Sequence, residues 1–247
     1  MERKFCDVGG AQSEDAVVLA NMIACCIINL MITANVLERV VRVTCEQGFG
    51  TGFLVDHEDR QYLVTARHVV DDCENPEIRS RGNIVKVELE RLTVPSPAAD
   101  VAVFRLDELL IKDLPLTCES DGYVFGQDAY FLGFPFGMTF DIGPEYFPLI
   151  KRATISGRSH LAGTRPVLLL DGWNNPGFSG GPLVFRPPTS RGLDEPMRVC
   201  GIITAYRQEP SALRHEGQEI SGAEVLVNSG IIIGEEIARV VETINAA

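Results

Sequence analysis

The sequence predicts an all-β protein built from two small barrels, and three observations support this fold class. Between residues 40 and 227, short apolar runs are separated by glycine, proline and aspartate, a pattern typical of barrels and sandwiches. The stretch 110–126 has the composition of a connector and divides these runs into two groups of similar size. Helical periodicity is confined to the two ends of the chain. We therefore expect an N-terminal segment (1–37), a first barrel (38–115) and a second barrel with a terminal helix (116–247).

The expected strands are rich in β-branched and aromatic residues, which favour a pleated, half-buried surface. With 247 residues, 45% of them apolar, the chain is long enough to bury the core that two barrels need. The strands are expected at 40–45, 52–55, 62–65, 84–89, 101–106, 129–134, 150–156, 167–170, 183–185, 198–206 and 224–227.

A short helix is expected at the C-terminal end. Apolar residues recur there at helical spacing, at Ile237, Val240, Val241 and Ile244. The run begins at Gly234, and two acids, Glu235 and Glu236, would lie in the first turn, where the helix dipole favours them. We expect this helix to pack on a barrel and no peptide-binding domain to follow it.

The N-terminal stretch 16–37 has no charged residue and is long enough to cross a bilayer. The long segment of mixed charge before it (1–15) and the absence of a small-residue cleavage site argue against a signal peptide. Polar residues on one helical face, Asn21, Asn29 and Thr33, argue against a spanning helix. We favour a helix packed on the barrels or on a partner chain, and a membrane helix stays open as the alternative.

The charge balance restricts the class of partner. The chain has 22 basic and 34 acidic residues, a net charge of -12, which disfavours nucleic acid and anionic lipid headgroups. Seven cysteines form an odd set without a C-x-x-C pair, so neither a zinc site nor a complete disulfide framework is expected. A reducing compartment follows, and we expect a cytoplasmic protein, with membrane anchoring through the N-terminal helix as the alternative.

Three local patterns with chemical meaning occur in a fixed order. His68 closes Thr-Ala-Arg-His after a β run, Asp100 opens the next run, and Ser179 lies in Gly-Phe-Ser-Gly-Gly-Pro. Alone, such a histidine is usually a surface residue and such an aspartate a turn residue, whereas G-x-S-G-G-P is far more specific. The order and the β context together favour a catalytic triad.

These motifs resemble those of the trypsin-like serine peptidases, and in particular the bacterial HtrA-like branch, here without a PDZ domain. The similarity covers residues 40–241. It includes residues 48–53, which we interpret as a turn before a hairpin. It also includes the segments 133–137, 153–157, 175–177 and 201–205. The resemblance implies a chymotrypsin-like fold of two six-stranded antiparallel barrels, with the site in the cleft between them. It also implies hydrolysis of peptide bonds through an acyl-enzyme.

The chemistry explains these residue types. A serine hydroxyl is a poor nucleophile at neutral pH, so Ser179 needs a base such as His68 within hydrogen-bond reach. An aspartate behind the ring fixes its tautomer, which is the role that the resemblance assigns to Asp100. The tetrahedral oxyanion needs converging backbone N–H donors, which we assign to Gly177 and Ser179.

The residues around the motif bear on activation and specificity. Phe178 stands where many family members have Asp or Asn, so activation by a newly cut N-terminus is not expected. Trp173 stands where the trypsin pattern has the acid that reads Lys or Arg. Thr204, Ala205 and Tyr206 resemble the strand that lines the primary pocket, and Tyr206 would narrow that pocket toward small or medium apolar residues.

The expected partner is therefore a peptide or protein substrate, with no cofactor and no metal. Two rival functions stay open at this point. One is a binding or scaffold protein with low or conditional turnover, and the other is an effector peptidase held in a larger assembly by its N-terminal helix. The oligomeric state does not follow from the sequence.

Overall fold

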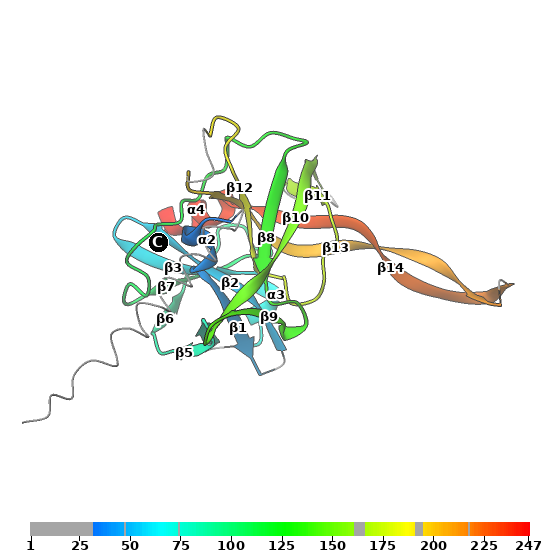
Figure 1. Cartoon of the computed structure of the whole chain (residues 1–247), viewed down its shortest axis with the longest axis horizontal. Coiled ribbons are helices and arrows are strands. Elements are labelled where there is room, and N and C mark those ends of the chain that lie inside the picture. The colour runs from blue at the N-terminus through cyan, green and yellow to red at the C-terminus, as the bar shows by residue number, and fades with distance from the viewer. Residues whose placement is uncertain (1–31, 47, 74, 161–165, 191–194, 217) are drawn as a thin grey trace, which may run out of the picture.

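The computed structural model describes residues 32–46, 48–73, 75–160, 166–190, 195–216 and 218–247. Two antiparallel sheets lie side by side and form a body from which one long hairpin projects (Figure 1). Helices are few and short among the described residues. The predicted all-β class with two barrel-like sheets is confirmed, and each sheet has seven strands where six were expected.

The first sheet has the strand order β5-β4-β1-β2-β3-β7-β6. Short hairpins join β1 to β2, β2 to β3 and β4 to β5, and each neighbouring pair in the sheet is antiparallel. Their bounds are β1 (Val40–Cys45), β2 (Gly48–His57), β3 (Arg60–Thr65), β4 (Glu77–Ser80), β5 (Asn83–Val85), β6 (Leu89–Arg91) and β7 (Ala102–Leu106).

The second sheet has the order β11-β14-β13-β12-β8-β10-β9, and an additional pairing of β10 with β11 closes it. Its bounds are β8 (Asp128–Gly133), β9 (Thr139–Ile142), β10 (Glu145–Ser159), β11 (Val167–Asp171), β12 (Pro182–Phe185), β13 (Arg198–His215) and β14 (Gln218–Glu236). A short 3-10 turn, η1 (Pro135–Gly137), follows β8.

Several expected elements need correction. The stretch 48–53 belongs to β2 and is not a turn, because Gly52 pairs with Val41 of β1 on one side and with Thr65 of β3 on the other. The expected strand 84–89 is divided between β5 and β6. Strands β4 and β9 were not expected, since β4 buries only Ile78 and its sequence has no clear alternation.

The described end of the N-terminal segment lies inside the body. The short helix α2 (Ala34–Leu37) buries Val36 and Leu37 in the core, together with the preceding Ile32. The amide of Asn35 donates to the carbonyl oxygens of Met197 at 3.2 Å and Pro115 at 3.3 Å. The remainder of the expected helix at 16–37 lies outside the described residues. No helix in the described part of the chain is long and apolar enough to cross a membrane.

The C-terminal helix is confirmed as α4 (Ala238–Asn245), which buries Val240 and Ile244 against the body. The placement of the two preceding acids was wrong. Glu235 and Glu236 are the last residues of β14, where they pair with Ile202 and Gly201 of β13. Strand β14 therefore extends to Glu236, beyond Gly234, where the apolar spacing predicts the start of the helix.

One hydrophobic cluster joins the two sheets. It contains Phe53 and Val64 from the first sheet and Leu132 and Ile202 from the second, all fully buried. Burial of apolar surface of this kind is the main force that fixes one sheet against the other. The relative position of loops from different sheets is thus set by a shared core, which is what a site between them requires. The limits of the expected domains, at 37 and 115, stay predictions.

Candidate active site

The histidine and the aspartate of the expected triad lie together on the first sheet. His68 is in the short helix α3 (Arg67–Val70), and Asp100 lies just before β7. The distance from His68 Nδ1 to Asp100 Oδ2 is 2.7 Å, and the backbone N–H of His68 donates to Asp100 Oδ1 at 3.0 Å. The ionised carboxylate accepts both bonds, so Nδ1 carries the proton and Nε2 is left as the basic nitrogen.

This pairing shifts both pKa values. The hydrogen bond to Asp100 and the negative charge of that carboxylate raise the pKa of His68, although burial works in the opposite direction. Burial by itself would raise the pKa of Asp100, but the hydrogen bonds from the His68 side chain and backbone outweigh it and lower that pKa. Asp100 is therefore ionised at neutral pH, and His68 is a stronger base than a free imidazole.

A second acid lies directly behind Asp100. Glu235 Oε1 accepts the backbone N–H of Asp100 at 3.2 Å, and burial raises the pKa of Glu235. Because Glu235 is on β14, this bond attaches the loop of Asp100 to the second sheet. No pattern in the sequence indicates this role, because helical spacing places Glu235 on a terminal helix.

Ser179 lies in a tight loop between β11 and β12 whose shape depends on two glycines. Gly177 has φ +102° and Gly180 has φ +86°, conformations that other residues rarely adopt. A Cβ on Gly177 would lie 2.3 Å from the carbonyl oxygen of Phe134, and one on Gly180 would lie 2.0 Å from that of Thr51. Only glycine fits at either position, which explains the G-x-S-G pattern.

The loop presents two backbone N–H groups that have no acceptor within the described part of the chain, those of Gly177 and Ser179. The carbonyl oxygen of Pro176 accepts the N–H of Phe136 at 3.0 Å, so it is turned away from the pocket. In a trans peptide the N–H points opposite to the carbonyl, and the Gly177 N–H is accordingly directed the other way. This is the orientation that donation to an oxyanion requires.

Thr51 of β2 holds this loop from the first sheet. Its backbone N–H donates to the carbonyl oxygen of Ser179 at 2.8 Å, and its hydroxyl donates to that of Gly177 at 2.6 Å. The same hydroxyl accepts the N–H of Phe134 at 3.1 Å. Thr51 was part of the quoted motif at 48–53, but its contact with the serine loop cannot be recognised when that motif is interpreted as a turn.

His68 and Ser179 line one pocket of about 380 Å³, together with Gly177, Phe49 and Cys45. Ser179 Oγ lies 3.5 Å from the carbonyl oxygen of Thr204 and makes no hydrogen bond to His68 within the described residues. Contacts between a nucleophile and its base are often long in the absence of substrate. The fold therefore brings the three expected residues to one site, and the histidine and the serine line the same pocket.

The expected specificity residues lie beside the serine loop. Trp173 is 57% exposed, and its carbonyl oxygen accepts the Lys151 ammonium group at 2.6 Å. Of the β13 residues, Thr204 is buried, Ala205 is exposed and Tyr206 is half-buried. Phe178, where many relatives have an acid, is fully buried and packs edge to face on a core phenylalanine.

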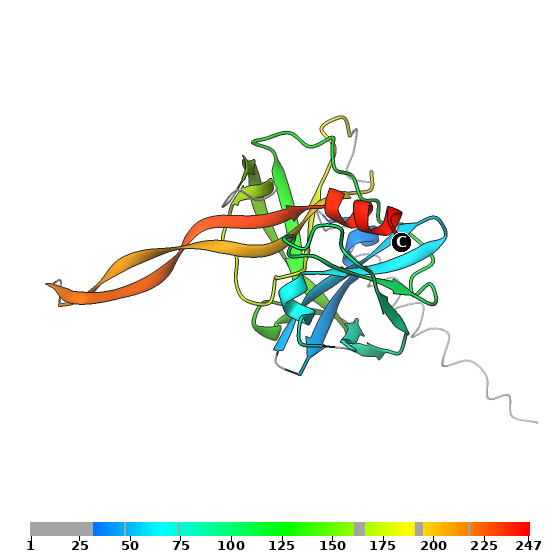
Figure 2. The same cartoon turned by 180° about the vertical axis from the view of Figure 1, so that it is seen from behind.

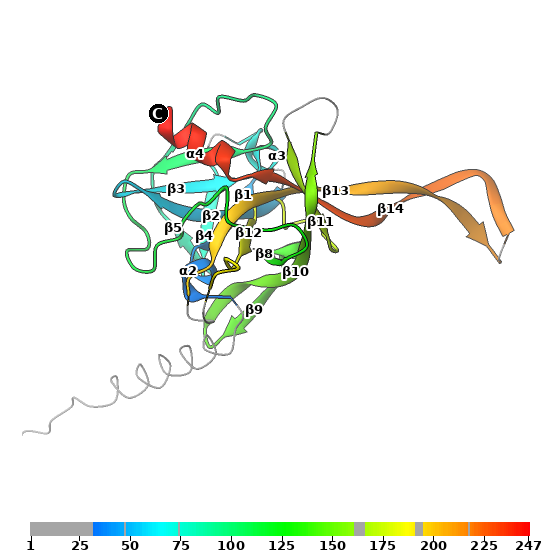
Figure 3. The same cartoon turned by 90° about the horizontal axis from the view of Figure 1, so that it is seen from above.

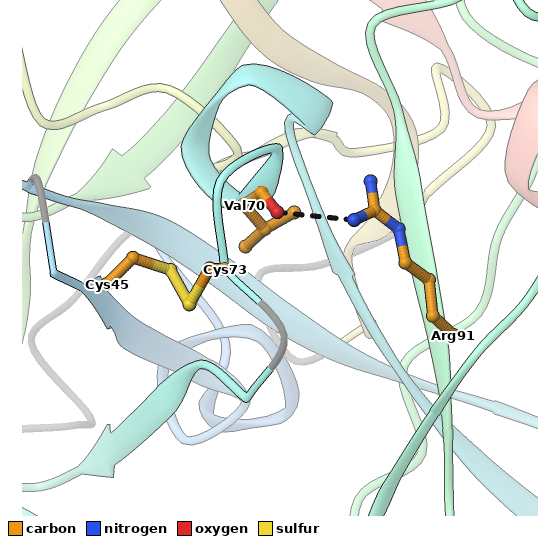
Figure 4. The surroundings of a disulfide bond; sticks show 4 residues. All are labelled: Cys45, Val70, Cys73 and Arg91. Atoms are coloured by element: carbon orange, nitrogen blue, oxygen red, sulfur yellow. Dashed lines mark hydrogen bonds between the residues drawn. A yellow bond between two sulfur atoms is a disulfide. The ribbon is translucent and has the colours of Figure 1, made fainter.

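A disulfide that the cysteine count did not predict supports the histidine helix. Cys45, at the end of β1, is bonded to Cys73, just after α3, and Arg91 Nη1 donates to the carbonyl oxygen of Val70 at 3.2 Å (Figure 4). The two contacts fasten α3 to β1 and β6. Disulfides persist mostly in oxidising compartments, so this pair weighs against the cytoplasmic location, which stays a prediction.

Removal of this disulfide should lower stability. The bond joins residues 28 positions apart, and closing a loop of that length in the unfolded chain contributes about 3–4 kcal/mol. We expect a double Cys45→Ser and Cys73→Ser variant to lose up to about this much free energy of unfolding, measured by denaturation in urea. Cys200→Ser, at a buried free thiol, is the control; an equal loss in that variant would contradict a specific role for the disulfide.

Comparisons with known proteins agree with this geometry. Solved structures with the same fold include the Rv3671c protease from M. tuberculosis in its active form, with 18% identity over 99% of this chain and 93% of that one (TM-score 0.57). They also include the HtrA-type protease AlgW with a tripeptide, with 22% identity over 92% of this chain and 62% of that one (TM-score 0.58). At these identities the likeness shows the fold.

No curated protein matches the sequence. The model of the trypsin-like peptidase domain, however, matches residues 50–186, which hold His68, Asp100 and Ser179. The matched segment is more than half of the 247 residues. The chain is thus a serine endopeptidase by family, and it belongs to the trypsin-like peptidases.

Proposed function

We propose that the chain hydrolyses peptide bonds through an acyl-enzyme formed on Ser179, with His68 as general base and Asp100 as its orienting partner. The observation that carries the proposal is the 2.7 Å contact between His68 Nδ1 and Asp100 Oδ2, which leaves Nε2 basic and facing the pocket that it shares with Ser179. A base prepared in this way is what a serine hydroxyl needs in order to attack a carbonyl.

The proposed reaction has two halves. In the first, Ser179 Oγ bonds to the carbonyl carbon while its proton passes to His68 Nε2, and the oxyanion is held by the N–H groups of Gly177 and Ser179. His68 then gives that proton to the leaving amine as the C–N bond breaks. In the second half, water attacks the acyl carbon while its proton passes to His68 Nε2. The bond from that carbon to Ser179 Oγ then breaks, and His68 returns the proton to Ser179 Oγ, which restores the free serine.

We further propose that the uncut chain is active. Phe178 has no charge that could pair with a new N-terminus and is instead buried in the core. The peptide between Pro176 and Gly177 is held by the bond from Phe136, with the Gly177 N–H turned away from that bond. No rearrangement after cleavage is needed to provide the oxyanion donors.

An active-site phosphonate tests the proposal. Because the phosphonate imitates the tetrahedral intermediate, we expect it to bond covalently to Ser179 of the intact chain, with the label located by mass spectrometry. The Ser179→Ala variant should take no label. Absence of label on the intact chain would favour a binding or scaffold role, whereas label only after cleavage near the start of β1 would show that the chain is made as an inactive precursor.

The labelling rate should depend on pH in a defined direction. His68 must be neutral to accept the Ser179 proton, and its hydrogen bond to Asp100 raises its pKa above the ordinary value of about 6.5. The rate should therefore be low below that pKa, rise as pH passes through it and level off above it. Stopped-time labelling between about pH 5 and 9 measures the curve. A rate that is flat across this range would contradict a histidine base.

The proposed specificity comes from Trp173 and from β13, which are not part of the lining of the pocket shared by His68 and Ser179. Trp173 stands where an acid would be needed to read Lys or Arg, and Tyr206 lies half-buried on the adjacent strand. We propose that a small or medium apolar residue precedes the cleaved bond, because neither side chain supplies a negative charge for a basic one. Peptides or proteins are the substrates.

A further inference from the structure

The hairpin of β13 and β14 extends far beyond the second barrel, and its outer part, residues 207–229, is here called the arm. All three views show the arm standing clear of the described body (Figures 1, 2 and 3). Its two strands pair with each other from Gln208 and Asn228 out to His215 and Gln218. No residue of the arm is part of a buried hydrophobic cluster of the described chain.

One edge of this hairpin is open along its whole length. Strand β12 pairs with β13 only as far as Ile202, and the serine loop binds Ile203. From Thr204 to His215, β14 is the only strand that lies beside β13 in the described part of the chain. The outward-facing N–H and C=O groups of this stretch are thus free to pair with an added strand.

The open edge begins at the reaction centre. The carbonyl oxygen of Thr204 lies 3.5 Å from Ser179 Oγ. The carbonyl oxygens of Ala205 and Arg207 are turned elsewhere, and they accept side-chain bonds from Asn174 at 3.4 Å and Ser229 at 2.9 Å. Ser229 is on β14, so the Arg207 carbonyl faces the paired edge of β13. The Thr204 carbonyl points to Ser179 instead, so the free edge begins on the side of Ser179. Two register shifts in the pairing with β14, between Ile203 and Ala205 and between Tyr206 and Gln208, lie in this stretch.

The arm also exposes apolar side chains for which the described structure provides no cover. Leu226 is 61% exposed, and Leu213, Val225 and Val227 are each at least 40% exposed. A two-stranded hairpin alone is only marginally stable in water, so pairing with a further strand would stabilise it. The arm has two arginines and four glutamates in a chain of net charge -12, which disfavours an acidic partner.

Family resemblance already implies that the start of this edge, Thr204 to Tyr206, pairs with the substrate next to the cleaved bond. We propose that this pairing continues outward along the arm, so that an unfolded polypeptide substrate adds a long antiparallel strand to the open edge of β13 from Arg207 to His215. This inference rests on the proposed function. Strand β13 runs outward from Ile203, so an antiparallel partner runs inward and brings its C-terminal part to Ser179. The stretch from Arg207 to His215 corresponds to about 30 Å of strand. The substrate class is therefore an extended, largely apolar polypeptide with roughly ten or more residues before the cleaved bond.

Two peptides of different length test this. Reduced lysozyme alkylated with iodoacetamide serves as the unfolded protein, and mass spectrometry locates a bond that the enzyme cleaves. Both synthetic peptides contain this bond, with about four residues before it in the short one and about fourteen in the long one, enough to reach the end of the arm. We expect kcat/KM for the long peptide to be about tenfold higher or more, which corresponds to about 1.4 kcal/mol.

Backbone methylation separates strand pairing from side-chain binding on the unaltered enzyme. Only every second N–H of an added strand faces its partner. Two further long peptides have N-methyl groups on alternate residues of the upstream part, one on the odd and one on the even positions. We expect one methylated peptide to lose the higher kcat/KM of the long peptide, and the other methylated peptide to keep more of that increase. If both retain the full gain, the added strand is wrong.

A variant with a shortened arm gives the matched test. Residues 210–226 are replaced by Asn-Gly, which joins Glu209 to Val227, a pair that already face each other. The bond from Asn228 to Asn174 of the body is kept, as is the bond from Ser229 to Arg207 at the base of the arm. We expect kcat/KM for the short peptide to stay within about twofold of the unaltered enzyme, and the advantage of the long peptide to disappear. If the variant does not fold, the methylated peptides still test the proposal, because they are used with the unaltered enzyme.

Three other results of these experiments would contradict the proposal, each for a different reason. A shortened arm that keeps the advantage of the long peptide overturns the proposal. Loss of self-association on size-exclusion chromatography, with that advantage unchanged, would show that the arm pairs with a second copy of the chain instead. If the intact chain cleaves neither peptide and takes no phosphonate label, the proposed function itself fails, and the proposal for the arm fails with it.

Discussion

Replacement of Ser179 or His68 by alanine is expected to lower kcat by about a million-fold while the fold stays intact. The serine and the histidine act as one unit in the proposed mechanism. Loss of the serine removes the nucleophile, and loss of the histidine removes the base without which the serine hydroxyl does not react. Neither side chain is part of a buried cluster, which is why the free energy of unfolding should change little. The measurement is turnover of a cleaved peptide, together with the urea unfolding midpoint.

Two controls separate chemistry from general damage. Ser156→Ala and His160→Ala change the same residue types at exposed positions on or near β10, away from the pocket. Both variants should keep kcat within about twofold of the unaltered enzyme, as is usual for surface substitutions. If Ser179→Ala also retains ordinary turnover, the assignment of the nucleophile is wrong and another residue must form the acyl-enzyme.

The residues that local sequence patterns identified are those whose surroundings are fixed by neighbours in the chain. The loop around Ser179 needs glycine at 177 and 180 for positive φ and close backbone contact, so the requirement appears in the sequence as G-x-S-G. His68 follows a strand, 62–65, that a run of β-branched and aromatic residues predicts. The fold class could be derived for the same reason, because short strands and turns leave local signals.

The residues that were missed act across the boundary between the sheets. Thr51 of the first sheet holds the loop of Ser179 in the second, and Glu235 of the second holds the loop of Asp100 in the first. Neither contact has a signature in the neighbouring sequence, since each depends on how the sheets are docked. Glycine-rich surroundings made Thr51 look like part of a turn, and helical spacing placed Glu235 on the wrong element.

The arm was missed for a different reason. Its sequence contains Pro210, Gly217 and Gly222 among mixed polar and apolar residues, a composition typical of a loop. The expected strand at 198–206 ends where the arm begins, and the one at 224–227 covers only a short part of the arm's second strand. Hairpin pairing outweighs the weak local preferences of these residues, as β-propensity depends strongly on context. Cys45 and Cys73 were likewise brought together only by the pairing of β1 with its neighbours.

The substitution Asp100→Asn is expected to lower kcat by about ten-thousand-fold with little change in structure. The asparagine oxygen can still accept the backbone N–H of His68, now bonded to Oδ1 at 3.0 Å. The amide NH₂ would then face Nδ1, which at present donates to Oδ2 at 2.7 Å. A donor in that place favours the tautomer with the proton on Nε2, so the nitrogen that should accept the Ser179 proton is already occupied.

The pH profile distinguishes this mechanism from simple loss of structure. The hydrogen bond to Asp100 is the main cause of the raised His68 pKa, so its removal should move the acidic limb of the remaining activity to lower pH. Asp72→Asn is the matched control, because Asp72 lines the pocket that contains His68, and its replacement removes one carboxylate charge there while the bond between His68 and Asp100 is kept. That variant should keep kcat within about tenfold of the unaltered enzyme. If Asp100→Asn also stays within tenfold, or loses activity with no shift of the acidic limb, Asp100 does not orient the base, and His68 must be held by its own backbone and by the α3 helix alone.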